Sequence, residues 1–175
     1  MLNEKSGIIK SGEISLVISN KSDAYALTRA QNANIKTLVI EKKDNANFED
    51  DIINALEENN IDLIVLAGFM CILSGDFTDK YTERIINVHP ALIPSFCGKG
   101  YYGLRVHEAA LEYGVKVTGA TVHFVNEIPD GGKIIMQKAV EIAPDDTAET
   151  LQLKVMEQAE WKILPLSVEK VCADM

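Results

Sequence analysis

The stretch Leu63-Ile64-Val65-Leu66-Ala67 is an uninterrupted run of aliphatic residues. A continuous apolar run of this length is typical of a strand in a parallel sheet that is covered on both faces. The runs Ile14–Ser19 and Ile35–Ile40 have the same character. Apolar residues at helical spacing follow each of these two runs, over 22–32 and from Asn47 onward. This alternation predicts an α/β fold, with a doubly wound, mostly parallel sheet and helices on both faces.

The second half of the chain continues with further strands and helices. We expect a strand at Ile85–Val88, a helix at Gly103–Tyr113, and two longer strands at Val115–Val125 and Ile134–Ile142. The form of a capping box appears at Asp146-Thr147-Ala148-Glu149. The helix that it opens is predicted to run through Ile163, with a break at Pro165. The length of 175 residues fits a single domain over 1–175.

Composition and charge restrict the partners that the chain can have. Hydrophobic residues make up 47% of the sequence, which is typical of a folded globular protein. The formal net charge is −9, and this sign argues against a nucleic-acid-binding surface, which needs a basic stripe. It still permits a small anionic substrate, because local amides or lysines can bind a phosphate.

The cysteines and the hydropathy pattern indicate a compartment. The three cysteines, Cys71, Cys97 and Cys172, are far apart and show no Cys-x-x-Cys spacing. We therefore expect neither a disulfide framework nor a metal site. No run approaches the roughly 20 apolar residues of a membrane span, and no signal peptide is visible. These features predict a cytoplasmic protein that does not bind membranes.

The stretch 87–96, Asn-Val-His-Pro-Ala-Leu-Ile-Pro-Ser-Phe, carries the first candidate chemistry. Asn87 and His89 are two residues apart in a predicted strand, so their side chains share a face, and Pro90 ends the strand there. An amide can donate to a developing oxyanion, and an imidazole can move protons. In the alternative interpretation the two residues only cap a strand. A nucleophilic pair of Cys97 with His89 is a further alternative.

Two other segments are expected near the same sheet edge, because ligands of open α/β sheets bind at the carboxyl ends of strands. Gly68–Leu73 follows one predicted strand, and Asp130 lies in a Pro-Asp-Gly-Gly turn. A carboxylate beside an imidazole orients the ring and raises its pKa. Alternatively, Asp130 is only a turn residue and the apolar side chains of 68–73 belong to the core. The residues alone therefore indicate an α/β domain with a candidate Asn, His and Asp site.

Four segments together carry a family resemblance. They are 66–74 (Leu-Ala-Gly-Phe-Met-Cys-Ile-Leu-Ser), 87–96, 118–125 (Thr-Gly-Ala-Thr-Val-His-Phe-Val) and 130–137 (Asp-Gly-Gly-Lys-Ile-Ile-Met-Gln). In order and spacing they resemble the glycinamide ribonucleotide (phosphoribosylglycinamide) formyltransferase family, from about Ile14 to the C-terminus. The resemblance implies a formyltransferase-type, Rossmann-like fold. It also implies transfer of a formyl group from the cosubstrate 10-formyltetrahydrofolate to the amine of glycinamide ribonucleotide in purine biosynthesis, without a metal, by a monomer or homodimer.

The resemblance also implies roles for individual residues. Asn87 would donate to the oxyanion, His89 would supply the proton, and Asp130 would hold the imidazole. The folate-binding residues would be Met70, Cys71, Ile72, Leu73, Asn87, Asn126, Glu127, Ile128, Pro129 and Asp130. Glu157 and Glu160 would meet the nucleotide, with Glu160 accepting from its ribose hydroxyls. His123 would lie near the site without carrying the proton, and His107 would be structural or solvated.

The family pattern is not complete in this sequence. Family members open with an apolar strand and a glycine-rich loop that binds the 5′-phosphate, and we expect both to be missing here. Residues 1–10 would then correspond to the end of the first helix and its exit. Without the loop, nucleotide binding should be weaker than folate binding. Cys71 takes the place of a usual Arg, and Asn45 takes the place of a basic residue near the folate glutamate tail.

Three other functions share parts of this pattern. Formyltetrahydrofolate deformylase has the same Asn, His and Asp, but it carries an additional N-terminal regulatory domain. Methionyl-tRNA formyltransferase has them too, with a C-terminal RNA-binding domain and a basic surface. The third alternative is a non-catalytic or impaired folate-binding remnant. The short acidic sequence favours the purine-biosynthetic formyltransferase.

Overall fold

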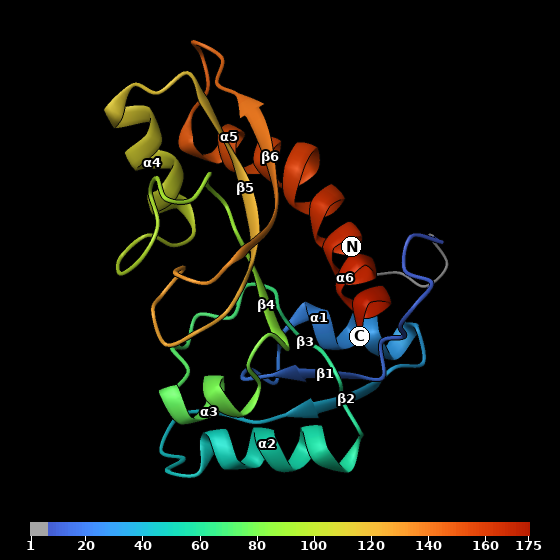
Figure 1. The fold of residues 1–175 in the computed structure, drawn as a ribbon. Coiled ribbons are helices and arrows are strands. Elements are labelled where there is room, and N and C mark those ends of the chain that lie inside the picture. The colour runs from blue at the N-terminus through green and yellow to red at the C-terminus, as the bar shows by residue number, and fades with distance from the viewer. Residues whose placement is uncertain (1–6) are drawn as a thin grey trace. The chain divides into compact units, whose positions relative to one another are not determined.

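The computed structural model describes residues 7–175 and divides into two compact units (Figure 1). The N-terminal unit is Glu13–Asp62, and the C-terminal unit is Leu63–Met175 together with residues 7–12. Both units combine strands with helices, which confirms the predicted α/β class. No helix in the described part of the chain is long and apolar enough to cross a bilayer.

The N-terminal unit alternates two strands and two helices. Its elements are β1 (Leu16–Ser19), α1 (Tyr25–Asn32), β2 (Lys36–Val39) and α2 (Phe48–Glu58). Strands β1 and β2 are parallel, with Leu16 opposite Lys36. Helix α2 begins directly after Asn47, as predicted, and α1 begins at Tyr25, within the predicted range 22–32, with Ala24 as its N-cap. Each helix buries its apolar face, which includes Leu27 in α1 and Ile52 in α2.

The C-terminal unit contains a four-stranded sheet of order β3-β4-β5-β6. Its elements are β3 (Ile64–Leu66), α3 (Gly75–Lys80), β4 (Ile85–His89), α4 (Leu104–Tyr113), β5 (Val117–Phe124), β6 (Ile134–Glu141), α5 (Ala148–Val155), the π-helix η2 (Met156–Glu160) and α6 (Trp161–Asp174). Strands β3 and β4 are parallel, and β4, β5 and β6 pair antiparallel. Apolar residues of β4, β5, α5 and α6 form the core, including Ile86, Val122, Leu151 and Val168.

Most predicted elements of the C-terminal unit are present, with two local differences. Helix α3 was not predicted; Ser74 caps it by accepting a hydrogen bond from the Phe77 N–H. The capping box of α5 lies one residue later than expected, because Thr147 pairs with Thr150. The carboxylate of Asp146 accepts hydrogen bonds from the Ala143 N–H and Lys154 Nζ instead.

The predicted break at Pro165 is wrong, because α6 continues through this proline. Pro165 lies inside α6, which continues directly from η2, so its missing N–H removes one possible intrahelical hydrogen bond without ending the helix. The irregularity falls just before the helix instead. In η2 the Trp161 N–H reaches back to the Met156 carbonyl, which widens the turn that contains Glu160.

The predicted end of a first helix within residues 1–10 lies mostly outside the described residues. Residues 7–10 contain no helix. The segment 10–12 docks on α6 instead, where the Glu169 carboxylate accepts hydrogen bonds from the N–H groups of Lys10 and Ser11.

Candidate active site

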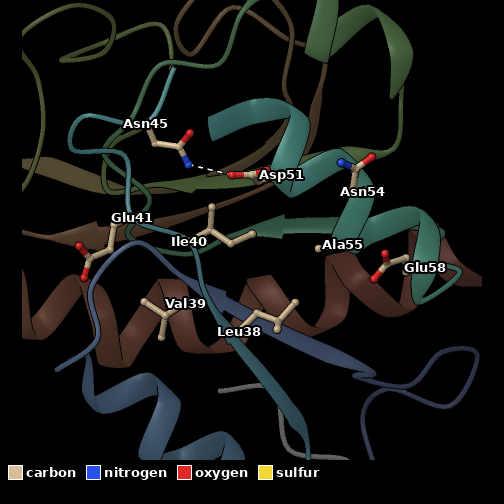
Figure 2. Close-up of a pocket in the computed structure, with 9 residues that line it drawn as sticks. All are labelled: Leu38, Val39, Ile40, Glu41, Asn45, Asp51, Asn54, Ala55 and Glu58. Atoms are coloured by element: carbon tan, nitrogen blue, oxygen red, sulfur yellow. Dashed lines mark hydrogen bonds between the residues drawn. The ribbon is translucent and has the colours of Figure 1, made fainter. Parts of the chain in front are cut away.

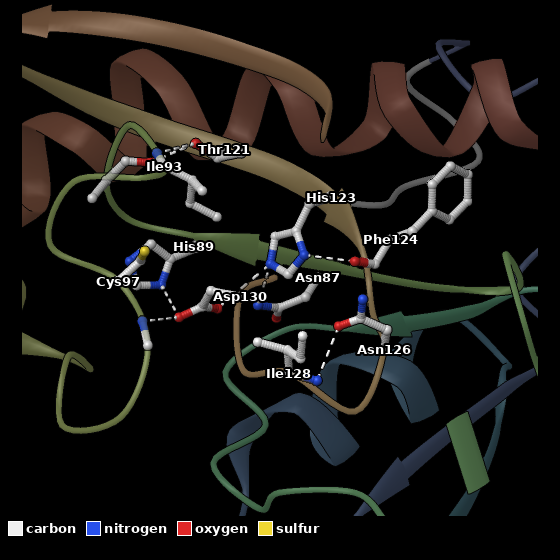
Figure 3. A network of polar contacts seen from close by, with 12 residues as sticks. Asn87, His89, Ile93, Cys97, Thr121, His123, Phe124, Asn126, Ile128 and Asp130 are labelled. Carbon is white, nitrogen blue, oxygen red and sulfur yellow. Dashed lines mark hydrogen bonds and ion pairs between the residues drawn. The ribbon is translucent and has the colours of Figure 1, made fainter. Parts of the chain in front are cut away.

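Strand β4 brings Asn87 and His89 to one face at its carboxyl end (Figure 3). The strand ends at His89, immediately before Pro90, as the sequence predicts. In the antiparallel pairing with β5, Asn87 lies opposite His123 and His89 lies opposite Thr121. His89 is buried, with 4% of its surface exposed, so its ring nitrogens depend on protein partners.

The turn between β5 and β6 delivers Asp130 to these side chains. Asn126 Oδ1 accepts a hydrogen bond from the Ile128 N–H, and the Ile128 carbonyl accepts one from Gly131. Asp130 has a φ of 57°, a left-handed conformation that Asp tolerates better than most residues. At Gly132 a Cβ atom would lie only 1.7 Å from the Phe124 carbonyl oxygen, so only glycine lets the turn pass this close to β5.

Asn87, His89 and Asp130 converge in the structure, together with His123 (Figure 3). Asp130 Oδ2 lies 3.5 Å from His89 Nδ1, and Asp130 Oδ1 lies 3.5 Å from His123 Nε2. Asn87 Nδ2 lies 3.3 Å from His123 Nε2. The Gly98 N–H donates to Asp130 Oδ2 at 2.8 Å. An amide and an imidazole from strand β4 and a carboxylate from the distant β5–β6 turn therefore share one site.

The hydrogen bonds fix which nitrogen of His89 can exchange a proton. His89 Nε2 lies 2.8 Å from the Phe96 carbonyl oxygen, which can only accept, so Nε2 carries a hydrogen. In the neutral ring the lone pair is then on Nδ1, which faces Asp130. The 3.5 Å separation between Nδ1 and the carboxylate is that of an ion pair and exceeds a normal N–H···O hydrogen bond. Nδ1 is therefore the titrating nitrogen.

The hydrogen bonds of His123 likewise fix its ring hydrogens, and with them the orientation of the Asn87 amide. Its Nδ1 lies 2.7 Å from the Phe124 carbonyl oxygen and must donate there. In the neutral ring Nε2 is then an acceptor, and one N–H of Asn87 Nδ2 donates to it. The second N–H of the same amide points away from this bond and is the one that an incoming oxyanion can use.

Burial and charge act in opposite directions on the site. Burial lowers the pKa of His89 below its usual value, although Asp130 and the Phe96 carbonyl oppose this and His123 adds to it. As predicted, the charge of Asp130 acts to raise the pKa of His89. The net pKa is nevertheless lowered, because the effect of burial is larger than that of Asp130. Burial alone would raise the pKa of Asp130, but the nearby ring of His123, the hydrogen bond from the Gly98 N–H and the imidazole of His89 hold it below its ordinary value.

A family model described as formyl transferase matches residues 2–168. The chain belongs to the formyl transferase family. It is 42% identical over 160 residues to the phosphoribosylglycinamide formyltransferase of Haemophilus influenzae, covering 90% of this chain and 73% of that protein. It is 45% identical over 166 residues to the trifunctional purine biosynthetic protein adenosine-3 of Homo sapiens, covering 93% of this chain. The match spans only 16% of the length of that human protein.

Solved structures of related enzymes also resemble this formyl transferase chain. The crystal structure of glycinamide ribonucleotide transformylase 1 from Symbiobacterium toebii superimposes with a TM-score of 0.89 at 35% sequence identity. The superposition covers 97% of this chain and 78% of that chain. The likeness to a solved structure therefore includes both units of the fold.

The two loops expected to hold a folate ring in this formyl transferase chain lie in the same unit. A Cβ atom at Gly75, at the start of α3, would lie 3.8 Å from Glu127 Oε2, so the segment after β3 approaches the 126–130 turn. Met70, Ile72 and Ile128 expose 61%, 66% and 58% of their surfaces. Exposed apolar side chains on facing loops are suited to cover a flat ring. The alternative core assignment fits only Leu73, which is buried; Cys71 is half-buried, and Asn126, Glu127 and Pro129 are exposed.

The two glutamates predicted to meet the nucleotide differ from each other. Glu157 is exposed, whereas Glu160 is half-buried on η2. Burial raises the pKa of Glu160 to about 7. In the described part of the chain the Glu160 carboxylate has no hydrogen-bond or ion-pair partner, so it stays available for a donor from a ligand.

All three histidines of the chain are buried. His107 on α4 is fully buried, and neither ring nitrogen has a hydrogen-bond partner. Burial, together with the nearby imidazole of His89, lowers the pKa of His107 to about 4. The solvated alternative for His107 is therefore wrong, and the structural alternative fits a neutral ring that packs close to His89.

The nucleophilic pairing of Cys97 with His89 is not supported. Cys97 Sγ donates to the Pro94 carbonyl at 3.3 Å, and both nitrogens of His89 face other groups. Burial and the charge of Asp130 raise the pKa of the Cys97 thiol, which disfavours the reactive thiolate. Among the described residues no group of three or more His, Cys, Asp or Glu side chains could hold a metal ion.

A groove in the N-terminal unit contains none of the predicted site residues (Figure 2). Its lining residues are Leu38, Val39, Ile40, Glu41, Asn45, Asp51, Asn54, Ala55 and Glu58. Asn45 is the residue expected in place of a basic one near the folate glutamate tail. Its Nδ2 donates to Asp51 Oδ2 at 2.8 Å, so a carboxylate holds its side chain. Lys42 lies 5.6 Å from the centre of the Phe48 ring, where it forms a cation–π contact.

Proposed function

We propose that the chain catalyses transfer of a formyl group from 10-formyltetrahydrofolate to the amine of glycinamide ribonucleotide. One observation carries the proposal: the Asn87 amide, the His89 imidazole and the Asp130 carboxylate meet at one site in a chain of the formyl transferase family. The named activity of the Haemophilus influenzae relative supports the same reaction.

In the proposed reaction the substrate amine attacks the formyl carbon and forms a new C–N bond. The carbonyl oxygen becomes an oxyanion, and the unused N–H of Asn87 donates to it. One donor of this kind contributes about 2.7–4 kcal/mol to transition-state stabilisation. The tetrahedral intermediate collapses as the bond between the formyl carbon and N10 of the folate breaks. The proton lost by the amine ends on N10.

His89 carries this proton. Its lowered pKa keeps the resting ring neutral, with the Nδ1 lone pair ready to accept the proton of the attacking amine. The resulting imidazolium then donates from Nδ1 to N10. Asp130, 3.5 Å away and ionised, stabilises the imidazolium while it exists.

The binding residues follow from exposure and from the family pattern. Met70, Ile72 and Ile128 would cover the folate pterin, and backbone groups of 70–73 and 126–130 would satisfy its polar edge. Glu160 would accept hydrogen bonds from the ribose hydroxyls, with Glu157 beside it. Each of these contacts is assigned by resemblance together with the exposure of the loops.

We also infer that the two units form a single formyltransferase domain over 1–175, because one family model spans residues from both. Such a domain would act in the cytoplasm on small-molecule substrates as a monomer or homodimer. The net charge of −9 supports small substrates over nucleic acid.

The test is a formyl-transfer assay with and without glycinamide ribonucleotide. We expect tetrahydrofolate release that depends on the nucleotide, and a loss of roughly 10²-fold in kcat for Asn87→Leu. Asn54→Leu, an exposed residue of α2, is the control and should keep the wild-type rate. Equal folate turnover without nucleotide would instead show a hydrolase, and folate binding without turnover would show a non-catalytic protein. Either result would overturn the proposal.

A further inference from the structure

Thr121 and Gln137 form a polar clamp on the segment that follows His89. Thr121 on β5 is fully buried, and its hydroxyl donates to the Ala91 carbonyl at 2.6 Å. The same oxygen accepts from the Ile93 N–H at 3.1 Å and from Gln137 Nε2 at 3.0 Å. Gln137 Nε2 also donates to the Ile93 carbonyl at 3.0 Å. The threonine hydroxyl therefore uses its donor and both acceptor positions.

The clamped segment leads directly to the groups that hold the site. The Ser95 N–H donates to the Leu92 carbonyl at 2.9 Å, which closes a turn just beyond the clamp. Phe96 follows with a φ of 48°, and its carbonyl accepts from His89 Nε2 at 2.8 Å. Two residues later the Gly98 N–H donates to Asp130. A shift of segment 91–93 would therefore move both bonds.

We infer that Thr121 and Gln137 are positioning residues, which hold the Phe96 carbonyl against Nε2 of His89 and so fix Nδ1 as the nitrogen that exchanges the proton. The inference deepens the proposed function, and its kinetic part rests on that function. Its structural part, the tautomer of His89, can be measured without turnover.

Several titratable groups face His89 and must be separated from the clamp. They are Asp130 from the β5–β6 turn, His123 from β5 and His107 from α4, with the Cys97 thiol near Asp130. None of them belongs to the clamp. Thr121 also lies opposite His89 in the strand pairing, whereas Gln137 lies on β6, which does not pair with β4, so a change of His89 in Gln137→Met is assigned to the position of the Phe96 carbonyl.

The decisive experiment is ¹⁵N NMR of the histidine ring nitrogens, in a chain that has only three histidines. A His89→Gln sample assigns the His89 signals. In the wild type we expect a neutral ring with hydrogen on Nε2. In Thr121→Val the signals should move toward a mixture of both tautomers, and Thr121→Ser, which keeps the hydroxyl, should restore the wild-type pattern. Gln137→Met should give a smaller change in the same direction.

Thr118→Val is the matched control. Thr118 lies on the same strand and is buried, but its hydroxyl has no hydrogen-bond partner. This variant should leave the His89 signals unchanged. If Thr121→Val does not fold, Gln137→Met decides, because Gln137 is exposed and its substitution spares the core. An unchanged His89 tautomer in folded Thr121→Val or Gln137→Met would overturn the inference.

The kinetic readout separates positioning from general stability. We expect Thr121→Val to lower kcat about 10-fold with both KM values within about twofold, since only the orientation of the proton carrier changes. The Phe96 bond favours the charged ring, so its loss should shift the His89 limb of the pH–kcat profile to lower pH. Loss of folded protein without a change in the profile would contradict a positioning role. If the wild type transfers no formyl group, the proposed function fails, but the NMR experiment still tests whether Thr121 and Gln137 fix the tautomer of His89.

Discussion

Asp130 and Glu160 are two partly buried carboxyl groups in the same unit, and their pKa values move in opposite directions. Asp130 accepts a hydrogen bond from the Gly98 N–H and faces the imidazoles of His89 and His123. Its pKa therefore falls below the ordinary value despite burial. Glu160 lies on the widened turn of η2 without a recorded partner in the described residues, and burial raises its pKa to about 7. Hydrogen-bond donors, and not burial alone, decide the charge of each group.

This difference separates two tasks. An ionised Asp130 is in place before any ligand arrives and can stabilise the imidazolium of His89 at once. Among the described residues no donor bonds to the Glu160 carboxylate, so a hydroxyl group of a ligand could donate to it. In the proposed function the first carboxyl group serves the chemistry and the second serves ligand binding.

The largest expected effect comes from Asp130→Asn, which removes the charge and keeps the shape. We expect kcat for formyl transfer to fall roughly 10³-fold, because the His89 imidazolium loses its counter-charge in a buried site. KM values should change little, since the substrates do not depend on this charge for binding. Steady-state kinetics measure both quantities. Asp145→Asn, at an exposed position, is the control, and a loss in KM alone would be inconsistent with this role.

The next effect concerns stability at Glu160. The pKa of this group is raised in the folded state, so it costs no stability below the unfolded value near 4.5, and the cost grows as the pH rises to about 7. Glu160→Gln should therefore stabilise the protein by roughly 3 kcal/mol near pH 8 and have little effect near pH 4.5. Urea unfolding at the two pH values measures this change. Glu157→Gln, at the exposed neighbour on η2, is the matched control.

A smaller effect is expected in nucleotide binding. Ionised Glu160 is the better acceptor for ribose hydroxyls, so the affinity for glycinamide ribonucleotide should rise about 10-fold from pH 6 to pH 8. Calorimetry at several pH values can follow this rise. The Glu160→Gln variant should show only the pH dependence of the ligand itself. Identical pH profiles for variant and wild type would remove Glu160 from the nucleotide site.

The sequence predicted the fold where one physical signal was sufficient. Apolar runs marked the strands, and Pro90 marked the end of β4 at His89. Helix α3 was missed because it is short and its main signal is the single cap at Ser74. Pro165 misled the prediction because α6 runs through this proline, and the irregular turn η2 lies before it.

The site shows a similar division. Asn87, His89 and Asp130 could be named from spacing, turn chemistry and family pattern, and the structure places them together. The Phe96 carbonyl and the Gly98 N–H could not be named, because backbone groups carry no sequence signal. The clamp by Thr121 and Gln137 depends on strand register, which the sequence does not display. The lowered pKa of His89 depends on burial, which only the packed structure reveals.

The most direct test compares the two carboxyl groups in one sample. ¹³C NMR of the labelled carboxyl carbons, with Asp130→Asn and Glu160→Gln used for assignment, follows both groups from pH 3 to pH 9. We expect Asp130 to be ionised and Glu160 to be protonated near pH 6, because only Asp130 has donors. Titration of Asp130 above its ordinary value near 3.8, or of Glu160 at its ordinary value near 4.5, would contradict this expectation.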